Sequence, residues 1–127
     1  MLEILQTKNK ENYRDKITEL GLDFDTSFVV DATDEGSSLG FGIYHFGIDD
    51  EYNPQVEVDF VSYNSDIMLF DGIIRSILFL AMMKGIDKAR FNISEADKLI
   101  KLGFVQNNYN SLDSIAKFMS KCKSCEN

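Results

Sequence analysis

The spacing of hydrophobic positions changes along the chain, and these changes predict the order of the structural elements. Residues 1–7 alternate apolar and polar positions, which is typical of a strand. Residues 8–20 place their few apolar side chains on one helical stripe, and Gly21 is a stop signal for that helix. Three further strand-like runs, separated by turn-rich segments, follow at residues 26–32, 39–46 and 56–63. We expect these three runs to pair as an antiparallel meander.

Alternation within the second and third runs predicts which side chains share a face of the sheet. In the second run one face holds Leu39, Phe41, Ile43 and His45. In the third run one face holds Val56, Val58 and Phe60, and the opposite face holds Glu57, Asp59, Val61 and Tyr63. The two acids on this run are either the polar side of a half-exposed strand or part of a chemical site.

Residues 66–84 form the most apolar predicted helix. Its wide apolar face can pack across a sheet and holds Phe70, Ile73, Ile74, Ile77, Leu78, Leu80 and Ala81. Phe79, Met82 and Met83 fall on the opposite side, with Asp71 and Arg75. An exposed apolar patch of this kind needs a cover. We expect either the C-terminal helix or a second copy of the chain, as a homodimer, to supply it.

The segment after this helix predicts a parallel strand. Gly85 is the expected end of the helix, and residues 88–93 have the pattern of a strand. Because a helix connects it to residues 56–63, this strand is expected to lie parallel to them.

The C-terminal part predicts two helices separated by a strand. Ser94 is the expected N-cap of a short helix, with Asp97 at the capping-box position, and Gly103 is the expected stop. Residues 104–109 are expected to form the last strand and residues 111–121 the final helix. The side chains expected to point inward from that helix are Leu112, Ile115, Ala116 and Met119.

Length and composition indicate one soluble domain. The chain has 127 residues, of which 44% are hydrophobic and 27% charged, as in ordinary globular proteins rather than disordered ones. We therefore expect residues 1–127 to form a single domain. No apolar run is long enough to cross a bilayer, and the first residues do not have the pattern of a secretion signal. We expect a cytoplasmic protein without membrane contact.

Charge is distributed unevenly along the chain, whose net charge is −8. From Ile17 through Ile74 there are thirteen Asp and Glu and no Lys or Arg, whereas basic residues outnumber acidic ones from Arg75 onward. An acidic surface repels nucleic acid and anionic lipid and attracts cations. We expect no nucleic-acid partner. The acidic half either attracts a small cationic amine or is a solvated surface that keeps the protein soluble.

The two cysteines, Cys122 and Cys125, are separated by two residues near the end of the chain. This spacing suits a redox pair or half of a four-thiolate zinc site. The pair follows the predicted last helix and no second pair completes a zinc site, so we expect a solvated tail and assign no metal. Two copies brought together in a dimer would supply four thiolates.

Two motifs resemble the superfamily of Gcn5-related N-acetyltransferases (GNAT). AMMKGIDKARF at residues 81–91 looks like the family's A-x-x-x-G-hydrophobic-x-x-hydrophobic run, and EADKLIKLGF at 95–104 looks like its second signature. Together with the order of predicted elements, the likeness spans residues 1–110. It implies an α+β fold, with a mixed, mostly antiparallel sheet flanked by helices, and transfer of an acetyl group from acetyl-CoA to a primary amine.

The resemblance also implies where the cofactor would lie. In the family, acetyl-CoA enters an opening between the fourth and fifth strands, and its pyrophosphate binds backbone amides of a Q/RxxGxG/A loop that starts the long helix. An ungapped count places the loop's conserved positions at Ser65, Met68 and Phe70, and the first glycine in this chain is Gly72. The cofactor-binding residues implied are Val61, Tyr63, Met68, Leu69, Phe70, Asp71 and Gly72. The bulk of Met68 and Phe70 is expected to hinder the pyrophosphate.

Glu57 is similar in position to the family's general base, which takes a proton from the attacking amine. The tyrosine that many members place four residues before the glycine of the LGF signature is replaced by Leu99, although Tyr63 or Tyr109 could substitute. His45, the single histidine, could lie across the meander from Glu57. The long connection between their strands leaves the register open, so we expect a lone histidine at a strand end.

These observations leave two hypotheses of different classes. One is a small, divergent acetyltransferase with Glu57 as base. The other is a non-catalytic binding or scaffold protein that keeps the fold without the cofactor loop. A thiol-based redox or zinc-linked dimer is a third alternative.

Overall fold

The computed structural model describes residues 1–106 and 110–124, with only the backbone described for 121–124. A six-stranded sheet has its strands in chain order: β1 (Leu2–Gln6), β2 (Ser27–Asp34), β3 (Ser37–Ile48), β4 (Pro54–Ser62), β5 (Ala89–Phe91) and β6 (Ser111–Leu112). The helices are α1 (Arg14–Glu19), α2 (Ile67–Met83), α3 (Ala96–Lys101) and α4 (Ile115–Ser124), with short 3-10 turns at Lys10–Tyr13 and Phe24–Thr26. Neighbouring strands are antiparallel except β4 and β5, which are parallel. The predicted fold class and the parallel pair are confirmed.

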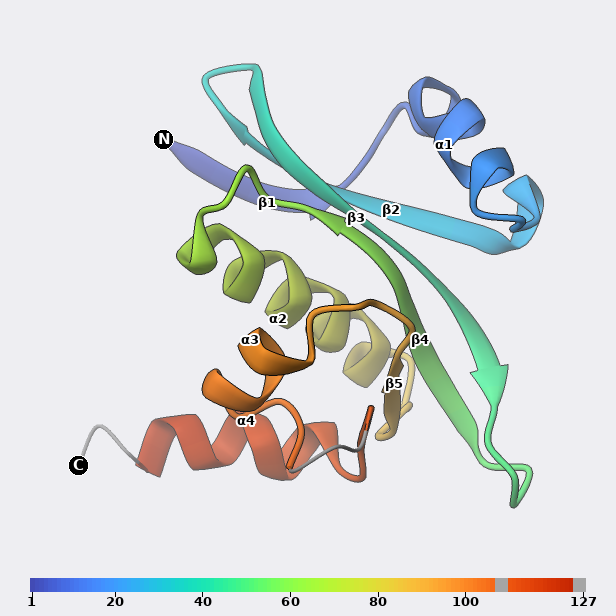
Figure 1. Ribbon diagram of the computed structural model, residues 1–127, viewed down its shortest axis with the longest axis vertical. Coiled ribbons are helices and arrows are strands. Elements are labelled where there is room, and N and C mark those ends of the chain that lie inside the picture. Colours follow the sequence, from blue (N-terminus) through green and yellow to red (C-terminus); the bar gives the residue numbers. More distant parts are fainter. Residues whose placement is uncertain (107–109, 125–127) are drawn as a thin grey trace.

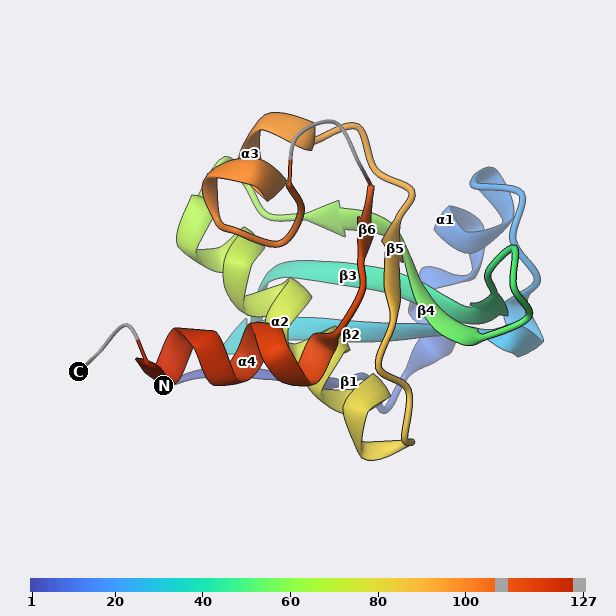
Figure 2. The same cartoon turned by 90° about the horizontal axis from the view of Figure 1, so that it is seen from below.

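Helices lie on both faces of the sheet. Figures 1 and 2 show α2, with α3 and α4 beside it, on one face and α1 on the other. The larger core lies between α2 and the sheet, and Val56 and Val58 of β4 are buried in it. The smaller core lies under α1 and centres on Ile17, Val29 and Ile43. None of the described helices has the length and hydropathy of a bilayer span.

A β-bulge in β4 changes the predicted alternation of side chains. Ile43 pairs with Phe60 and Tyr44 with Val58, so Asp59 is an extra residue between two paired positions. Beyond the bulge the faces are exchanged. Phe60 packs in the smaller core rather than beside Val58, and the prediction that these two share a face is wrong.

All three predicted glycine stops are confirmed, and each has the same geometry. Gly85, for example, has a φ of 81° and donates its amide to Met82, while the Ile86 amide bonds to the Ala81 carbonyl. This is a Schellman motif, in which the left-handed residue favours glycine. Equivalent bonds end α1 at Gly21 and α3 at Gly103.

The C-terminal part differs most from prediction. The N-cap of α3 is Glu95 rather than Ser94, and it makes no side-chain capping bond. Residues 104–106 are not a strand, and 107–109 lie outside the described residues. The last strand is instead Ser111–Leu112, which pairs with β5, so the final helix starts four residues later than predicted.

The predicted inward face of the C-terminal segment is confirmed in part, since Leu112 of β6 and Met119 of α4 pack against the larger core. Ile115 and Phe118 are buried in it, whereas Ala116 is exposed. The Ile115 amide bonds to the Asp87 carbonyl, and the Asp87 carboxylate accepts from the Ala116 amide and the Ser114 hydroxyl. The start of α4 is thus fixed by a residue distant in sequence.

The predicted apolar patch on the outer side of α2 is narrower than expected. Met82 is half-buried against the larger core, whereas Phe79 and Met83 are exposed. These two side chains lie four positions apart on one helix and form a small patch. The predicted homodimer stays a prediction, which light scattering at high protein concentration can test.

Candidate functional site

Acidic side chains of β4 meet the single histidine of β3 on the sheet face opposite α2. His45 is the pairing partner of Glu57, and its Nε2 lies 3.8 Å from Glu57 Oε1. Its Nδ1 lies 2.6 Å from Asp59 Oδ2. The expectation of a lone histidine is therefore wrong, because the pairing register of β3 and β4 brings the three groups together.

Asn92, which directly follows β5, joins the two carboxylates. Its Nδ2 donates to Glu57 Oε1 at 3.0 Å and to Asp59 Oδ1 at 2.9 Å. Gln55 Nε2 donates to the other Glu57 oxygen at 3.2 Å. We call His45, Glu57, Asp59 and Asn92 the carboxylate cluster.

The carboxylate cluster holds acidic charge in a partly buried place. The Glu57 side chain is 18% exposed and that of Asp59 is 7% exposed. Among the described residues, no Lys or Arg lies within ion-pair distance of either carboxylate. Buried charges are costly unless they are paired. A cation, either a protonated His45 or a ligand, is the complement that this arrangement favours.

Gly47 of β3 makes room for Glu57. A β-carbon built at Gly47 would overlap the Glu57 carboxylate, so the absence of a side chain there lets this carboxylate lie over the β3 backbone. The position of the carboxylate therefore depends on a residue outside the cluster.

A polar groove of about 510 Å³ runs from Glu57 along the β3–β4 turn and β5. It is lined by Asp49, Asp50, Glu51, Gln55, Lys88, Arg90 and Asp113, with a few apolar neighbours. Lys88 Nζ pairs with Asp49 Oδ2 at 3.0 Å, so one basic residue of the groove is already neutralised. The remaining lining is mainly acidic.

Asp49 is the most strongly perturbed acid of this groove. Hydrogen bonds from the Asn53 amide, the Lys88 ammonium and the Glu51 amide stabilise its charged form and lower its pKa to about 2. In turn, the hydrogen bond to Asp49 raises the pKa of Lys88. This residue ties the β3–β4 turn to the start of β5.

The strands β4 and β5 separate just after the carboxylate cluster. Their pairing ends at Val58 and Phe91, with a last bond of 2.8 Å from the Asn92 amide to the Val58 carbonyl. Val61 of β4 and Tyr63 just after it pack against the larger core, with Val56 and Val58. The prediction that they share a face with Glu57 is therefore wrong. The separation of β4 and β5 is the opening in which the resemblance places a cofactor.

Contacts from the start of α3 cross that opening. The Tyr63 hydroxyl donates to Glu95 Oε2 at 3.2 Å, and Lys98 Nζ donates to the same oxygen at 2.9 Å. Leu99, at the position of the family's tyrosine, is fully buried in the core. Tyr109 lies outside the described residues. The one described tyrosine named as a substitute is thus bonded to α3.

The first turn of α2 has its amides occupied by the chain itself. Asp66 Oδ1 accepts from the Met68 amide at 3.0 Å and the Leu69 amide at 3.3 Å. The Phe70 amide bonds to the Asp66 carbonyl at 3.0 Å, as the helix requires. Amides at a helix start are the groups that would hold a pyrophosphate, and these amides are already satisfied.

The side chains of this turn also serve the fold. Leu69 and Phe70 are buried in the core, and Asp71 pairs with Arg75 at 2.9 Å. A β-carbon at Gly72 would lie 2.8 Å from Ile4 Cδ1, so this glycine allows close packing of α2 on β1. The residues of this turn do not fit a pyrophosphate group. The assignment of Val61, Tyr63 and residues 68–72 as cofactor contacts stays a prediction.

Two functional contacts were missed from the sequence. Asp66 was placed at the start of the helix without its capping role, although Asp at that position is a strong capping signal. Asn92 is positioned by the register of β5 against β4, which the sequence leaves open. Cys122 lies in α4 with its side chain undescribed, and Cys125 lies outside the described residues, so the thiol hypothesis stays a prediction.

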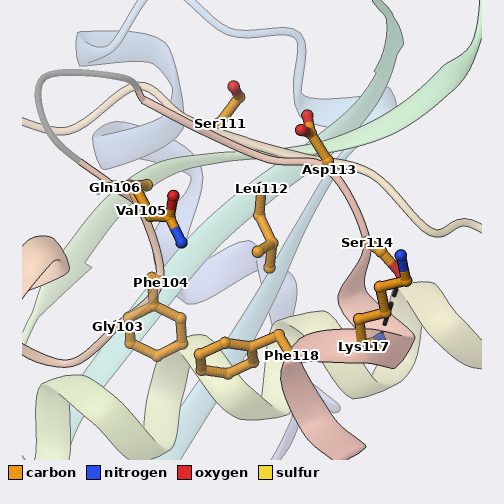
Figure 3. Close-up of a pocket in the computed structure, with 10 residues that line it drawn as sticks. All are labelled: Gly103, Phe104, Val105, Gln106, Ser111, Leu112, Asp113, Ser114, Lys117 and Phe118. Carbon is orange, nitrogen blue, oxygen red and sulfur yellow. Dashed lines mark hydrogen bonds between the residues drawn. The ribbon is translucent and has the colours of Figure 1, made fainter. Parts of the chain in front are cut away.

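A second cavity, of about 800 Å³, lies between the end of α3, β6 and α4 (Figure 3). Leu112 points toward the rings of Phe104 and Phe118, whose centroids are 4.8 Å apart. Both phenylalanines are buried, so the apolar floor is closed. At the rim, Ser114 Oγ accepts from the Lys117 amide, which caps α4. The packing of α4 beside β6 and the end of α3 forms this cavity, and no residue of the carboxylate cluster lines it.

Comparison with known proteins identifies the fold. No family model and no curated protein matches the chain. A ribosomal-protein-alanine N-acetyltransferase from Brucella melitensis biovar Abortus 2308 is similar in structure, with a TM-score of 0.62 and 11% identity, over 86% of this chain and 95% of that one. A predicted acetyltransferase from Clostridium acetobutylicum, solved with acetyl-CoA, has a TM-score of 0.61 and 9% identity, over 85% and 92%.

A third similar structure is the KacTA–DNA complex, with a TM-score of 0.62 and 13% identity, over 95% of this chain and 99% of that one. At these identities the likeness concerns the fold alone. The chain has the GNAT fold, and the resemblance read from the sequence is confirmed at that level.

Proposed function

We propose that this chain is a binding protein with the acetyltransferase fold, which recognises a cationic group, such as a primary amine, beside Glu57 without using acetyl-CoA. The observation that carries the proposal is the pair of partly buried carboxylates, Glu57 and Asp59, which have no Lys or Arg partner among the described residues. His45 contacts both carboxylates but can carry at most one positive charge, so a bound cation would complement the other. Glu57 lines the groove where such a ligand can enter.

The charge around the groove supports a cation rather than an anion. Asp50, Glu51 and Asp113 line it with no ion-pair partner among the described side chains, while Lys88 is bound by Asp49. Arg90 is turned to Asn92, with its Nε donating to Oδ1 at 3.3 Å. A surface with this balance concentrates amines and repels phosphates.

Acetylation of an amine is the second candidate function. Glu57 lies next to the point where β4 and β5 separate, and one protein of similar structure was solved with acetyl-CoA. In this alternative the same groove would bind the amine and Glu57 would take its proton. The occupied amides of α2 weigh against it, because they leave the cofactor's pyrophosphate without its usual donors.

The charge also bears on other partners. With a net charge of −8, the protein is expected not to bind nucleic acid. The DNA in the KacTA complex is a property of that assembly. The small cationic amine and the cytoplasmic location stay predictions.

Calorimetric titration separates the two candidate functions. We expect spermidine to give saturable binding heat with the wild-type protein. We expect acetyl-CoA to give none at about 1 mM, a concentration at which a ligand of micromolar affinity, about 8 kcal/mol of binding free energy, would saturate the protein. Glu57→Gln should weaken spermidine binding about tenfold or more, whereas Glu51→Gln, which removes an equal charge from the same groove, should change it less.

Failure of spermidine and of a lysine-containing peptide to bind at millimolar concentration would remove the proposal. Micromolar binding of acetyl-CoA would favour the second candidate. In that case, full transferase activity in Glu57→Gln would exclude Glu57 as the base.

A further inference from the structure

We infer that Asp66 is the residue that keeps a diphosphate, and hence CoA, off the start of α2, because its carboxylate takes the place of the phosphate on the helix amides. This inference rests on the proposal that the protein does not use acetyl-CoA, and it names the residue responsible.

The position of Asp66 is fixed from both sides. On the helix side, Oδ1 accepts from the amides of Met68 and Leu69. On the strand side, the Asp66 amide donates to the Tyr63 carbonyl at 2.9 Å. The two residues between, Asn64 and Ser65, have φ values of 52° and 61°, in the left-handed region that favours glycine. A strained turn therefore presents the carboxylate to the helix.

The charge near this turn adds to the exclusion. Lys98, whose Nζ lies 5.7 Å from the centre of the Tyr63 ring beside this turn, is paired with Glu95. Arg75, further along α2, is paired with Asp71. The helix dipole favours one negative group at this end, and Asp66 already supplies it. An incoming diphosphate would therefore meet the Asp66 carboxylate, while the described basic side chains named here are already paired.

The missing loop glycines are a weaker explanation. Met68 is 73% exposed and Phe70 is fully buried in the core. Among the described side chains, only the Asp66 carboxylate accepts hydrogen bonds from the Met68 and Leu69 amides. Pyrophosphate is excluded because the amide donors are already occupied, not because a large side chain fills the space. One substitution, at Asp66, is therefore enough to free the donors.

Titration with inorganic pyrophosphate tests the inference, because this probe needs the amides and nothing further along the opening. We expect no saturable binding of pyrophosphate to wild type. Asp66→Gly should bind pyrophosphate with an affinity at least about tenfold above the upper limit measured for wild type, since free amides at a helix start form an anion site. Glycine is a tolerated N-cap, so the variant is expected to fold, and circular dichroism confirms this before titration.

Two control variants separate occupancy from charge. Asp66→Asn keeps a capping oxygen but removes the charge, and Asp71→Asn removes an equal charge further along α2 without freeing an amide. Because charge is the smaller part of the exclusion, both should gain much less pyrophosphate affinity than Asp66→Gly. A gain in either control equal to that of Asp66→Gly would overturn the inference, and so would a folded Asp66→Gly without any gain. Failure of spermidine and of the lysine-containing peptide to bind would overturn the proposed function and leave this inference standing, so the two failures are distinguishable. Acetyl-CoA binding to wild type would overturn both.

Discussion

His45 Nδ1 lies 2.6 Å from Asp59 Oδ2, beside the bulge that makes Asp59 an extra residue of β4. Because the Asp59 side chain is only 7% exposed, removal of its partner should leave an acceptor that solvent satisfies poorly. We expect His45→Phe to lower the free energy of unfolding by about 1–3 kcal/mol. Urea unfolding monitored by circular dichroism measures this change.

A double-mutant cycle tests whether the loss comes from this pair. Asp59→Asn removes the charge, and the double variant should cost less than the sum of the two single ones, by about 0.5–3 kcal/mol. Additive losses would mean that His45 stabilises the fold through its other contacts. In that case the carboxylate cluster is not an energetic unit.

Substitution by alanine should have different effects on stability and ligand binding at two glycines of β3, Gly47 and Gly40. In Gly47→Ala the new methyl group meets the end of the flexible Glu57 side chain, which can move. We expect stability close to wild type but weaker spermidine binding, because the carboxylate is displaced from its place at the groove. Calorimetry and urea unfolding on the same sample report the two effects.

Gly40→Ala is the matched control for this prediction. There the methyl group would overlap the backbone carbonyl of Ser62 on β4, which cannot move without disturbing the sheet. We expect a loss of about 1–3 kcal/mol of stability, as in other overpacked sites, with the carboxylate cluster still in place. Equal stability losses in Gly40→Ala and Gly47→Ala would contradict the assigned role of Gly47.

The acid dependence of stability should report Asp49. Its pKa is lowered from 3.8 to about 2 in the folded protein. A lowered pKa in the fold contributes stability that is present above the unfolded value and is lost as pH falls through the folded one. We therefore expect a decline in the urea midpoint between about pH 4 and pH 2, to which Asp49 contributes.

The variant Asp49→Asn should be less stable than wild type at pH 7, and the difference should shrink toward pH 2. Asp50→Asn is a suitable control, since Asp50 is exposed in the same turn and no hydrogen bond to its carboxylate is found among the described residues. A pH-independent difference between wild type and Asp49→Asn would show that its charge is not what stabilises the turn.

The sequence predicts what depends on local signals. Gly21, Gly85 and Gly103 mark the helix ends because a left-handed residue is needed there, whatever surrounds it. The parallel relation of β4 and β5 follows from the connecting helix. What failed depends on register and on distant contacts. The bulge at Asp59 moves Phe60 to the other face, and Asp87 fixes the start of α4 from 28 residues before Ile115.

The candidate site shows the same division. Glu57 was placed by resemblance and by alternation along one strand. Its partners His45 and Asn92 come from other strands, so they depend on two registers that no local pattern in this chain specifies. An Asp at the first position of a helix is a local signal, and its capping role was available from the sequence.

The stability of α2 provides an independent test of the Asp66 cap. Replacement of an N-cap Asp by Ala commonly costs about 1 kcal/mol, whereas Asn and Gly at this position cost much less. We expect Asp66→Ala to lower the free energy of unfolding by about this amount and Asp66→Asn to stay near wild type. If Asp66→Ala is as stable as wild type, its carboxylate does not hold the Met68 and Leu69 amides in solution. Those donors would then be free, and the closed cofactor site on which the proposed function rests would be open to a phosphate.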